Sequence, residues 1–293
     1  MPDAHDLLTT AEVADLLRIK ERKVYDLVAG GLIPYVRVTG KLLFPRALLD
    51  AWIARNSVRG GEACAPRPNV LVGSHDPLLD WALREAGTGL AAFCDGSLDG
   101  LHRLAQGEAV AAGLHLPGEG EDGPNVEQVQ AALAGRPIVL LEWARRSQGL
   151  IVPAGNPKGI GGLADLEGLR FVPRQPGAGA RLLFERLCRD RGVDPEALPQ
   201  EPPARSEAEV ALAVAEGRAE AGFGLAAPAR QFRLGFVPLA EERFDLLVWR
   251  PAYFEPPLQR LFAFCRTAPF LERARSLAGY DVGGLGTVRF NAP

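Results

Sequence analysis

The sequence predicts an α/β protein in two parts, a small N-terminal unit and a larger body. The 293 residues are enough for about two domains, and 47% hydrophobic with 24% charged residues is ordinary globular usage. A stretch at 56–69, reading NSVRGGEACAPRPN, is rich in Gly, Pro and small residues and lacks periodicity, as linkers do. After this stretch, short apolar runs alternate with amphipathic helical segments, which favours an α/β fold with mostly parallel sheets.

These observations predict a domain at 1–56, a linker at 57–69 and a body at 70–293. Residues 1–60 carry nine Lys/Arg and seven Asp/Glu, a net of +2, whereas the remainder carries 24 and 29, a net of −5. Together they give the total of −3. A basic module on an acidic body suggests that the small part binds nucleic acid.

The N-terminal unit has the pattern of short helices and a hairpin. Thr9 or Thr10 followed by Glu12 predicts a helix start, residues 18–21 a turn, and 22–30 a second helix that ends at Gly30-Gly31. Residues 35–38 and 42–44 are expected to pair across Thr39-Gly40, and Pro45 to begin a third helix. The residues expected to face inward are Val13, Leu16, Leu17, Val24, Leu27, Val28, Leu48, Leu49 and Trp52.

Two helices, a tight turn and a hairpin wing form the anatomy of a winged helix-turn-helix, whose second helix enters the major groove of double-stranded DNA. The expected DNA-binding residues are Lys20, Arg22, Lys23 and Tyr25 on the second helix and Arg37 and Lys41 on the wing. The alternative is that these are solvated charges on a small interaction domain. The pattern LTTAEVADLL…VYDLVAGGLIP resembles the excisionase-type family, which is related to the MerR type and implies a DNA-binding module.

In the body, the expected strands are 70–72, 109–116, 138–142, 150–152, 169–172, 221–225 and 244–249. The expected helices are 77–85, 99–106, 126–134, 179–191 and 207–216. The loop 117–125, which reads PGEGEDGPN, is expected at the surface. About 225 residues are natural for two lobes rather than one sheet.

Several turns before helices have the chemistry of anion sites, because helix N-termini present unpaired N–H groups and the positive end of the dipole. The turns contain Ser74-His75-Asp76, Ser97, Gln175–Arg181 and Ser206. The chain lacks GxxxxGK[ST] and GxGxxG, which disfavours nucleotide hydrolysis and a dinucleotide site. The segment PGAGAR instead predicts a short anion cradle with Arg181 one turn into the helix, although Arg181 could equally form a surface ion pair.

The stretch from 70 to 289 resembles the periplasmic-binding-protein-like domain of the molybdate-binding type, a type 2 two-lobed fold. The similarity lies in SHDPLLD, GSLDGLHRLAQGEAVAAGLHL, RRSQGLIVPAGNPKGIGGLADLEGLRFVPRQPGAGARLLFERL and SEAEVALAVAEGRAEAGFGLA. It implies that Ser74, Ser97, the loop of Gly177, Ala178 and Gly179, and the backbone of Ala208 hold a tetrahedral oxyanion, molybdate or tungstate. A tyrosine that completes the site in some relatives has no counterpart near Leu225, and Arg181 is an extra cation.

The resemblance also implies that the body closes about a hinge. We expect crossings near 149–153 and 234–238, with lobe one at 70–148 and 238–293 and lobe two at 151–233. The candidate ligand-binding residues are Ser74, His75, Asp76, Ser97, Gln175, Gly177, Ala178, Gly179, Arg181, Ser206 and Ala208.

The remaining features narrow the class of protein. No apolar run reaches a membrane span, and the start of the chain, with Asp3 and Asp6 and no basic residue, is not a secretory signal. Four separate cysteines and four histidines, with no CxxC or metal-ligand spacing, argue against a disulfide scaffold, a metal centre or a cofactor. We therefore expect a cytoplasmic, oligomeric transcription regulator that binds DNA and an oxyanion, and is not an enzyme.

Two alternatives remain open. The first is a molybdenum-related enzyme with Asp76, His75 and Arg181 as reactive groups, although no nucleophile–base pair supports it. The second is a regulator that senses a small organic acid or a pterin, with Phe93, Phe171 and Phe223 lining the site. Trp81, Trp143 and Trp249 are expected in the core or at the hinge.

Overall fold

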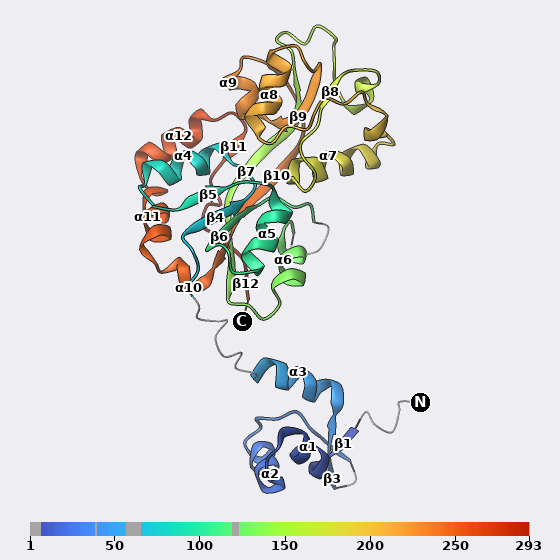
Figure 1. The fold of residues 1–293 in the computed structure, drawn as a ribbon, viewed down its shortest axis with the longest axis vertical. Helices are drawn as coiled ribbons and strands as arrows, with labels where there is room; N and C mark the ends of the chain where they lie inside the picture. The colour runs from blue at the N-terminus through green and yellow to red at the C-terminus, as the bar shows by residue number, and fades with distance from the viewer. Residues whose placement is uncertain (1–6, 39, 57–65, 119–122, 293) are drawn as a thin grey trace. The chain divides into compact units, whose positions relative to one another are not determined.

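Residues 7–38, 40–56, 66–118 and 123–292 are described by the computed structural model of the protein. The chain divides into two units, 1–65 and 66–293, which are treated separately (Figure 1). Some expectations fall outside the described residues: those on the start of the chain, on Thr39 in the hairpin turn, on linker residues 57–65 with Cys64, and on 119–122 of the acidic loop.

The N-terminal unit has the expected order of helices and hairpin, with one further strand. Its elements are β1 (Leu7–Thr9), α1 (Thr10–Leu17), α2 (Glu21–Ala29), β2 (Val36–Val38), β3 (Lys41–Pro45) and α3 (Arg46–Asn56). Thr9 caps α1 in a capping box: its hydroxyl accepts from the Glu12 N–H at 3.3 Å, and the Glu12 carboxylate accepts from the Thr9 N–H at 2.7 Å. The strands form a sheet in the order β1-β3-β2.

The core of this unit contains most of the residues expected to face inward. Val13, Val24 and Leu49 are fully buried. Leu16 and Leu48 were expected there wrongly, because they are 40% and 54% exposed. For Leu16 the helical period of 100° per residue explains the difference, since the inward stripe of α1 passes through Val13 and Ala14 and leaves Leu16 on the flank.

The body contains nine strands and nine α-helices within the described residues. The strands are β4 (Val70–Gly73), β5 (Ala91–Phe93), β6 (Ala111–Leu114), β7 (Ile138–Val152), β8 (Phe171–Val172), β9 (Ala221–Leu225), β10 (Gly235–Trp249), β11 (Tyr280–Asp281) and β12 (Val288–Asn291). The helices are α4 (Pro77–Glu85), α5 (Ser97–Ala105), α6 (Val126–Leu133), α7 (Gly179–Asp190), α8 (Glu207–Ala215), α9 (Ala226–Gln231), α10 (Arg250–Tyr253), α11 (Pro256–Phe264) and α12 (Ala268–Ser276). The five helices expected from the sequence are confirmed, with small shifts at their ends.

The sheet of the body is mixed, so the expectation of mostly parallel pairing is wrong. Its order is β5-β4-β6-β10-β7-β9-β8, with β11 and β12 also on β7. Pairs β4/β5, β4/β6 and β8/β9 are parallel, whereas every pair that involves β7 or β10 is antiparallel. The reason is that β7 and β10 are two strands of 15 residues that run alongside each other in opposite directions.

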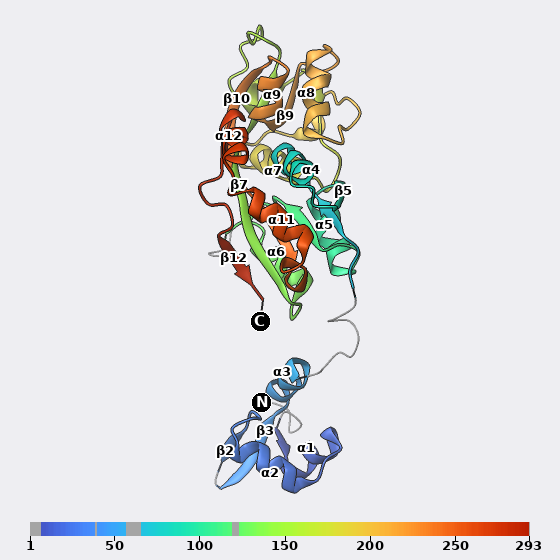
Figure 2. The same cartoon turned by 90° about the vertical axis from the view of Figure 1, so that its left-hand side faces the viewer.

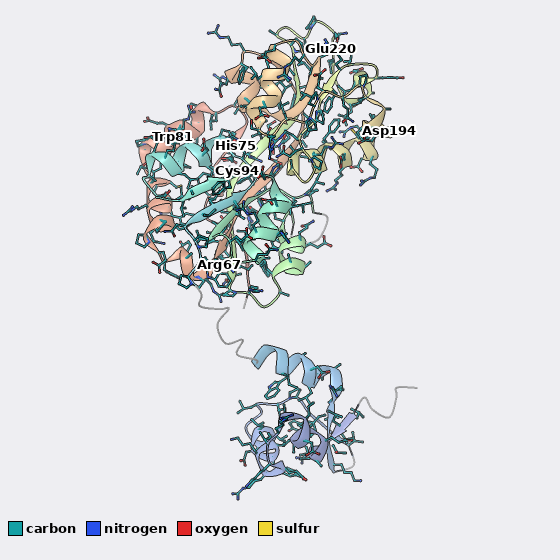
Figure 3. The ribbon with its side chains drawn as sticks, viewed as in Figure 1. Arg67, His75, Trp81, Cys94, Asp194 and Glu220 are labelled. Carbon is teal, nitrogen blue, oxygen red and sulfur yellow. The ribbon has the colours of Figure 1, made fainter. Side chains whose placement is uncertain are left out.

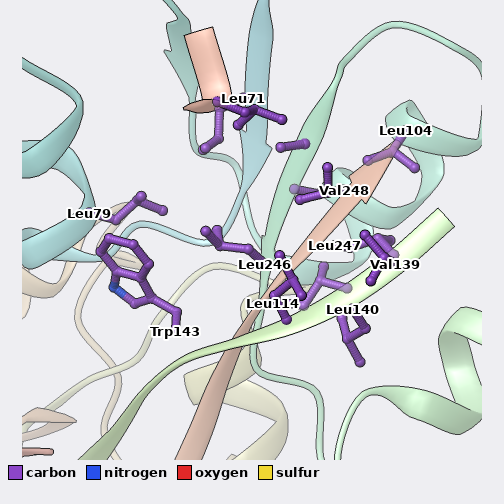
Figure 4. Packing of buried hydrophobic residues seen from close by; sticks show 14 of the residues in the cluster. Leu71, Leu79, Leu104, Leu114, Val139, Leu140, Trp143, Leu246, Leu247 and Val248 are labelled. Carbon is purple, nitrogen blue, oxygen red and sulfur yellow. The ribbon is translucent and has the colours of Figure 1, made fainter. Parts of the chain in front are cut away.

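These two strands pass from one lobe to the other (Figures 1 and 2). The first-lobe core, part of which is shown in Figure 4, includes Ala144 and Phe244. A second-lobe core includes Leu150, and Leu239 packs against it. The crossings therefore lie between residues 144 and 150 on β7 and between 239 and 244 on β10. The crossing expected near 149–153 overlaps the range on β7, whereas the one expected near 234–238 lies outside the range on β10, and Leu239, expected in lobe one, packs on lobe two.

Within the described residues, we find no helix with the length and apolar character that a transmembrane segment requires.

Candidate functional site

The residues expected to contact DNA are exposed on the N-terminal unit. Val24 and Val28 of α2 are buried in its core, which leaves the other face of the helix at the surface. All six candidates are exposed, namely Lys20, Arg22, Lys23, Tyr25, Arg37 and Lys41. The helix and the wing thus present cations and one aromatic ring, which are suitable groups for phosphate and groove contacts.

In the body, the first two candidate serines form a buried pair. Ser74 follows β4, and Ser97 is the first residue of α5. Their hydroxyl oxygens are 2.7 Å apart, and the side-chain oxygen of Ser97 also accepts from the backbone N–H of His115 at 3.1 Å. The structure thus brings together two hydroxyls from segments 23 residues apart.

A close approach of α5 to β4 positions this pair. A Cβ atom on Gly100 would lie 2.3 Å from the Cα of Gly73, so α5 could not approach β4 this closely if Gly100 had a side chain. Gly73 also has φ of +101°, a conformation that favours glycine. The turn after β4 therefore places Ser74 directly at the N-terminus of α5, where the helix dipole favours an anion.

Next to the serines, the crossing strands carry a buried cluster of charged and polar side chains. Glu242 of β10 accepts from Arg146 of β7, from the ring of His115 at 2.6 Å and from the Gln148 amide at 3.0 Å. Arg146 is 1% exposed and Gln148 is fully buried. His115 therefore connects the crossing strands to Ser97, which its backbone N–H contacts.

Asp76 is engaged inside the protein rather than directed at a ligand. Its carboxylate accepts from the Leu79 N–H at 2.7 Å, as the cap of α4. It also accepts from the Trp143 indole at 3.0 Å, from Arg146 at 2.8 Å and from the Tyr280 hydroxyl at 2.7 Å. With four donors around two oxygens, Asp76 fixes the loop of Ser74 to β7.

The pKa values in the cluster follow from burial and charge pairing. Burial favours the neutral acid, but Arg146 and His115 outweigh it and hold the pKa of Glu242 at about 2. Burial also opposes the charge of Arg146, yet Glu242, Tyr280 and Asp76 keep its pKa well above the ordinary value. Burial, assisted by Asp76, raises the pKa of Tyr280 well above its usual range, so Tyr280 is a donor.

The Gly-rich loop of the second lobe lies against the first lobe at the serine pair. The carbonyl of Gly177 accepts from the Leu98 N–H at 3.4 Å, and Gly179, the first residue of α7, packs on His115. Gly177, Ala178 and Gly179 are therefore beside Ser97, as expected, and the N-termini of α5 and α7 meet there.

Four other candidates are held away from this point or take other roles. Arg181 pairs with Glu185 and, at 2.9 Å, with Glu196, so the surface ion pair is its observed role. The remaining three are placed as follows: Gln175 donates to the carbonyl of Arg205, Ser206 caps α8 through the Glu209 N–H, and Ala208 is exposed.

The sequence reasoning missed a buried ion pair near α8. Arg174 pairs with Glu207 and donates to the carbonyl of Ala204 at 3.2 Å. Glu207 in turn accepts from the Leu225 N–H at 3.2 Å. Each of the two buried arginines in the described part, Arg146 and Arg174, thus has a buried carboxylate partner.

The grouping of Ser97, His115 and Glu242 does not have the geometry of a catalytic triad. The Ser97 oxygen bonds the backbone N–H of His115, whereas the imidazole ring bonds Glu242. His75 lies on the side of the first lobe that faces the second (Figure 3), and its buried Nδ1 has no hydrogen-bond partner among the described residues. Within those residues no group of three or more metal-ligating side chains occurs.

A hollow of about 360 Å³ lies beside the His115–Glu242 pair. Residues of the first lobe, the crossing strands and α7 line it, among them Arg145, Leu183 and Arg186. The aromatic residues proposed for an organic ligand do not line it. Phe171 and Phe223 are in the second-lobe core, and Phe93 is half-exposed on β5.

Comparison with known proteins agrees with this architecture. Residues 7–57 match a family described as a helix-turn-helix domain, and residues 81–266 match one described as a PBP superfamily domain. The second match spans more than half of the chain, which therefore belongs to the PBP superfamily. A related protein of Bacillus subtilis (strain 168), described as uncharacterized protein YvgK, is 30% identical over 302 residues and covers 96% of each chain.

Two solved structures share the fold of the body. One is a putative phosphate ABC transporter substrate-binding protein from Clostridium perfringens with bound phosphate, at a TM-score of 0.53 and 12% identity. It covers 70% of this chain and 96% of its own. The other is a tungstate ABC transporter structure from Geobacter sulfurreducens, at a TM-score of 0.50 and 13% identity. It covers 69% of this chain and 95% of its own. The two-lobed binding-protein-like fold and the N-terminal helix-turn-helix expected from the sequence are confirmed.

Proposed function

We propose that this protein is a cytoplasmic transcription regulator that binds double-stranded DNA through α2 and the wing and senses a small tetrahedral oxyanion between the lobes of its body. The observation that carries the proposal is the buried pair Ser74 and Ser97 facing the start of α7, in a chain that also has a helix-turn-helix domain. We further propose that binding alters the affinity for DNA, and that the protein acts as a homo-oligomer on paired half-sites.

The charges around the serine pair support an oxyanion as the ligand. The buried cations Arg146 and Arg174 are neutralised by carboxylates, so the serine hydroxyls are left as neutral donors. Such donors can replace the hydration shell of a dianion without a fixed countercharge. A cage of limited size separates ions by radius, and for this reason we propose molybdate or tungstate rather than sulfate.

Calorimetric titration of the full chain with molybdate, tungstate, phosphate and sulfate tests this proposal. We expect micromolar or tighter binding of molybdate and tungstate, and loss of that binding in the double variant Ser74→Ala/Ser97→Ala. Ser276→Ala, an exposed serine on α12, is the matched control and should bind as the wild type does. No binding of any of the four ions would contradict the proposal.

The hollow beside His115 favours a second candidate, a small organic acid as the sensed ligand. Three arginines (Arg145, Arg186 and Arg243) and Leu183 line this hollow with two carboxylates, Glu241 and Glu242, and the excess of cations would suit a carboxylate with a short apolar part. The buried positions of Phe171 and Phe223 disfavour a stacked pterin. Binding of an organic acid that survives Ser74→Ala/Ser97→Ala would favour this candidate.

A further inference from the structure

The two lobes of the body touch each other directly around the start of α7. The Leu98 N–H donates to the carbonyl of Gly177, and the guanidinium of Arg205 pairs with Asp95 at 2.8 Å. Leu182 of α7, a second-lobe helix, packs against the first-lobe core. All three contacts join segments from different lobes and are made by atoms of the chain itself.

A fourth and closer contact between the lobes is that of Gly179 with His115. A Cβ atom on Gly179 would lie 2.4 Å from the His115 carbonyl oxygen and 2.7 Å from its ring Nδ1, far below any real Cβ contact. Gly96 makes a similar approach, since its Cβ would lie 2.9 Å from the Gly177 oxygen. The lobes can therefore meet here only because neither glycine has a side chain.

His115 cannot move aside to make room for a side chain at 179. Its backbone N–H is bonded to Ser97, its ring is bonded to Glu242 at 2.6 Å, and the ring stacks on Phe244 with centroids 5.8 Å apart. A methyl group at 179 would therefore push the second lobe away from the first rather than displace His115.

We propose that the contact of Gly179 with His115 determines closure of the body, and that the lobes close through this contact without a bridging ligand. Gly96, Leu98 and His115 of the first lobe and Gly177 and Gly179 of the second form what we call the closure seam. An ion at the serine pair would then stabilise the closed form that these direct contacts allow. The closure seam itself does not depend on the proposed function, but a role of the seam in regulation rests on that proposed function.

The structure provides a direct way to trap the seam. A Cβ atom on Gly177 would lie 3.8 Å from the Cβ of Leu98, which is the usual separation in a disulfide. We would introduce Leu98→Cys and Gly177→Cys into the full chain, remove small anions by dialysis, and follow the cross-link by mass spectrometry of the linked peptides. Because φ of Gly177 is +79°, rates are compared only among variants that carry the same cysteine pair.

We expect the cross-link to form in this ion-free protein. Adding Gly179→Ala should slow formation of the cross-link about tenfold, because the population of the closed form falls. Gly179 is helical, so alanine there adds no backbone strain of its own. Gly162→Ala is the matched control, because Gly162 is in the same lobe, is extended with φ of −171°, and has open space around it.

Two outcomes would overturn the proposal. If the cross-link formed only after tungstate or phosphate was added, closure would be driven by the ligand. If Gly179→Ala and Gly162→Ala slowed it equally, Gly179 would not be the determining contact. The measurement follows lobe closure and needs no DNA, and the comparison of Gly179→Ala with Gly162→Ala needs no added ion, so it can fail or succeed independently of the proposed function.

Discussion

At the residue scale, the charged side chains buried in the body find partners that are distant in the sequence, so no local pattern indicates their roles. The positions of Ser74, Ser97 and the loop at Gly177 before or at the start of helices could be predicted, because such turn residues have a recognisable chemistry. Arg146 and Glu242 could not, because each acquires its role only from a partner 96 residues away. For the same reason the engagement of Asp76 by Arg146, Trp143 and Tyr280 was not predictable.

Removing the charge of Glu242 is expected to destabilise the body. Glu242→Gln would leave Arg146 with only one buried carboxylate and would weaken the bond to the His115 ring. Breaking a buried ion pair in this way typically costs about 3–5 kcal/mol of unfolding free energy, measurable by urea denaturation. The neighbouring Glu241→Gln, which changes an exposed side chain, is the control and should leave stability nearly unchanged.

The same carboxylate predicts an acid dependence of stability. The pKa of Glu242 is lowered from its ordinary 4.5 to about 2 in the folded protein. Its contribution is therefore complete above about pH 4.5 and is lost as the pH falls toward 2, because the unfolded chain binds the proton more readily. Urea titrations between pH 5 and 3 should show a shallower loss of stability in Glu242→Gln than in the wild type. Equal slopes would contradict the assignment.

At the element scale, helices were more predictable than strands. The apolar period of α4 and α6 and the side-chain caps of α4 and α8 are local signals, and the sequence-based bounds were close to those observed. The strand β7 was divided into two expected strands, 138–142 and 150–152, because Arg145, Arg146 and Gln148 interrupt its apolar run. Arg146 and Gln148 continue the strand because Glu242 of β10 and the Asp76 loop satisfy them, whereas Arg145 is exposed and pairs with Glu142 of β7 itself.

For α2, we predict that its cations supply affinity for DNA. The variant Arg22→Ala/Lys23→Ala should weaken binding to duplexes selected from a random pool, and should make the plot of log affinity against log salt shallower by about 2. Arg46→Ala on α3 removes an exposed cation that is paired with Asp50, and serves as the control. Fluorescence anisotropy at several salt concentrations measures both. An unchanged salt slope would exclude α2 as the DNA-contacting element.

At the scale of the whole molecule, the division into two units was foreseeable from the linker composition and the change of pattern after it. The exact path of the crossing was not, since a hinge within two long paired strands has no turn residues to mark it. The lobes separate instead where the apolar contacts of β7 and β10 change from one core to the other, between Ala144 and Leu150 on the first strand.

The proposed action on paired half-sites predicts a homo-oligomer. Light scattering coupled to size exclusion should give at least twice the chain mass of 31.4 kDa for the full protein. The same measurement on Arg22→Ala/Lys23→Ala should give an unchanged mass, because those exposed residues are assigned to DNA. A monomer at micromolar concentration, both free and on DNA, would contradict the paired half-site arrangement.

The central claim, that an ion between the lobes controls DNA binding, is tested most directly by one titration. The affinity of the full chain for its selected duplex would be measured at increasing tungstate, in the wild type and in Ser74→Ala/Ser97→Ala. We predict a change of at least about fivefold in the wild type, as expected for coupled sites, and none in the serine variant. An affinity that no oxyanion changes, or that changes equally in both proteins, would contradict the account.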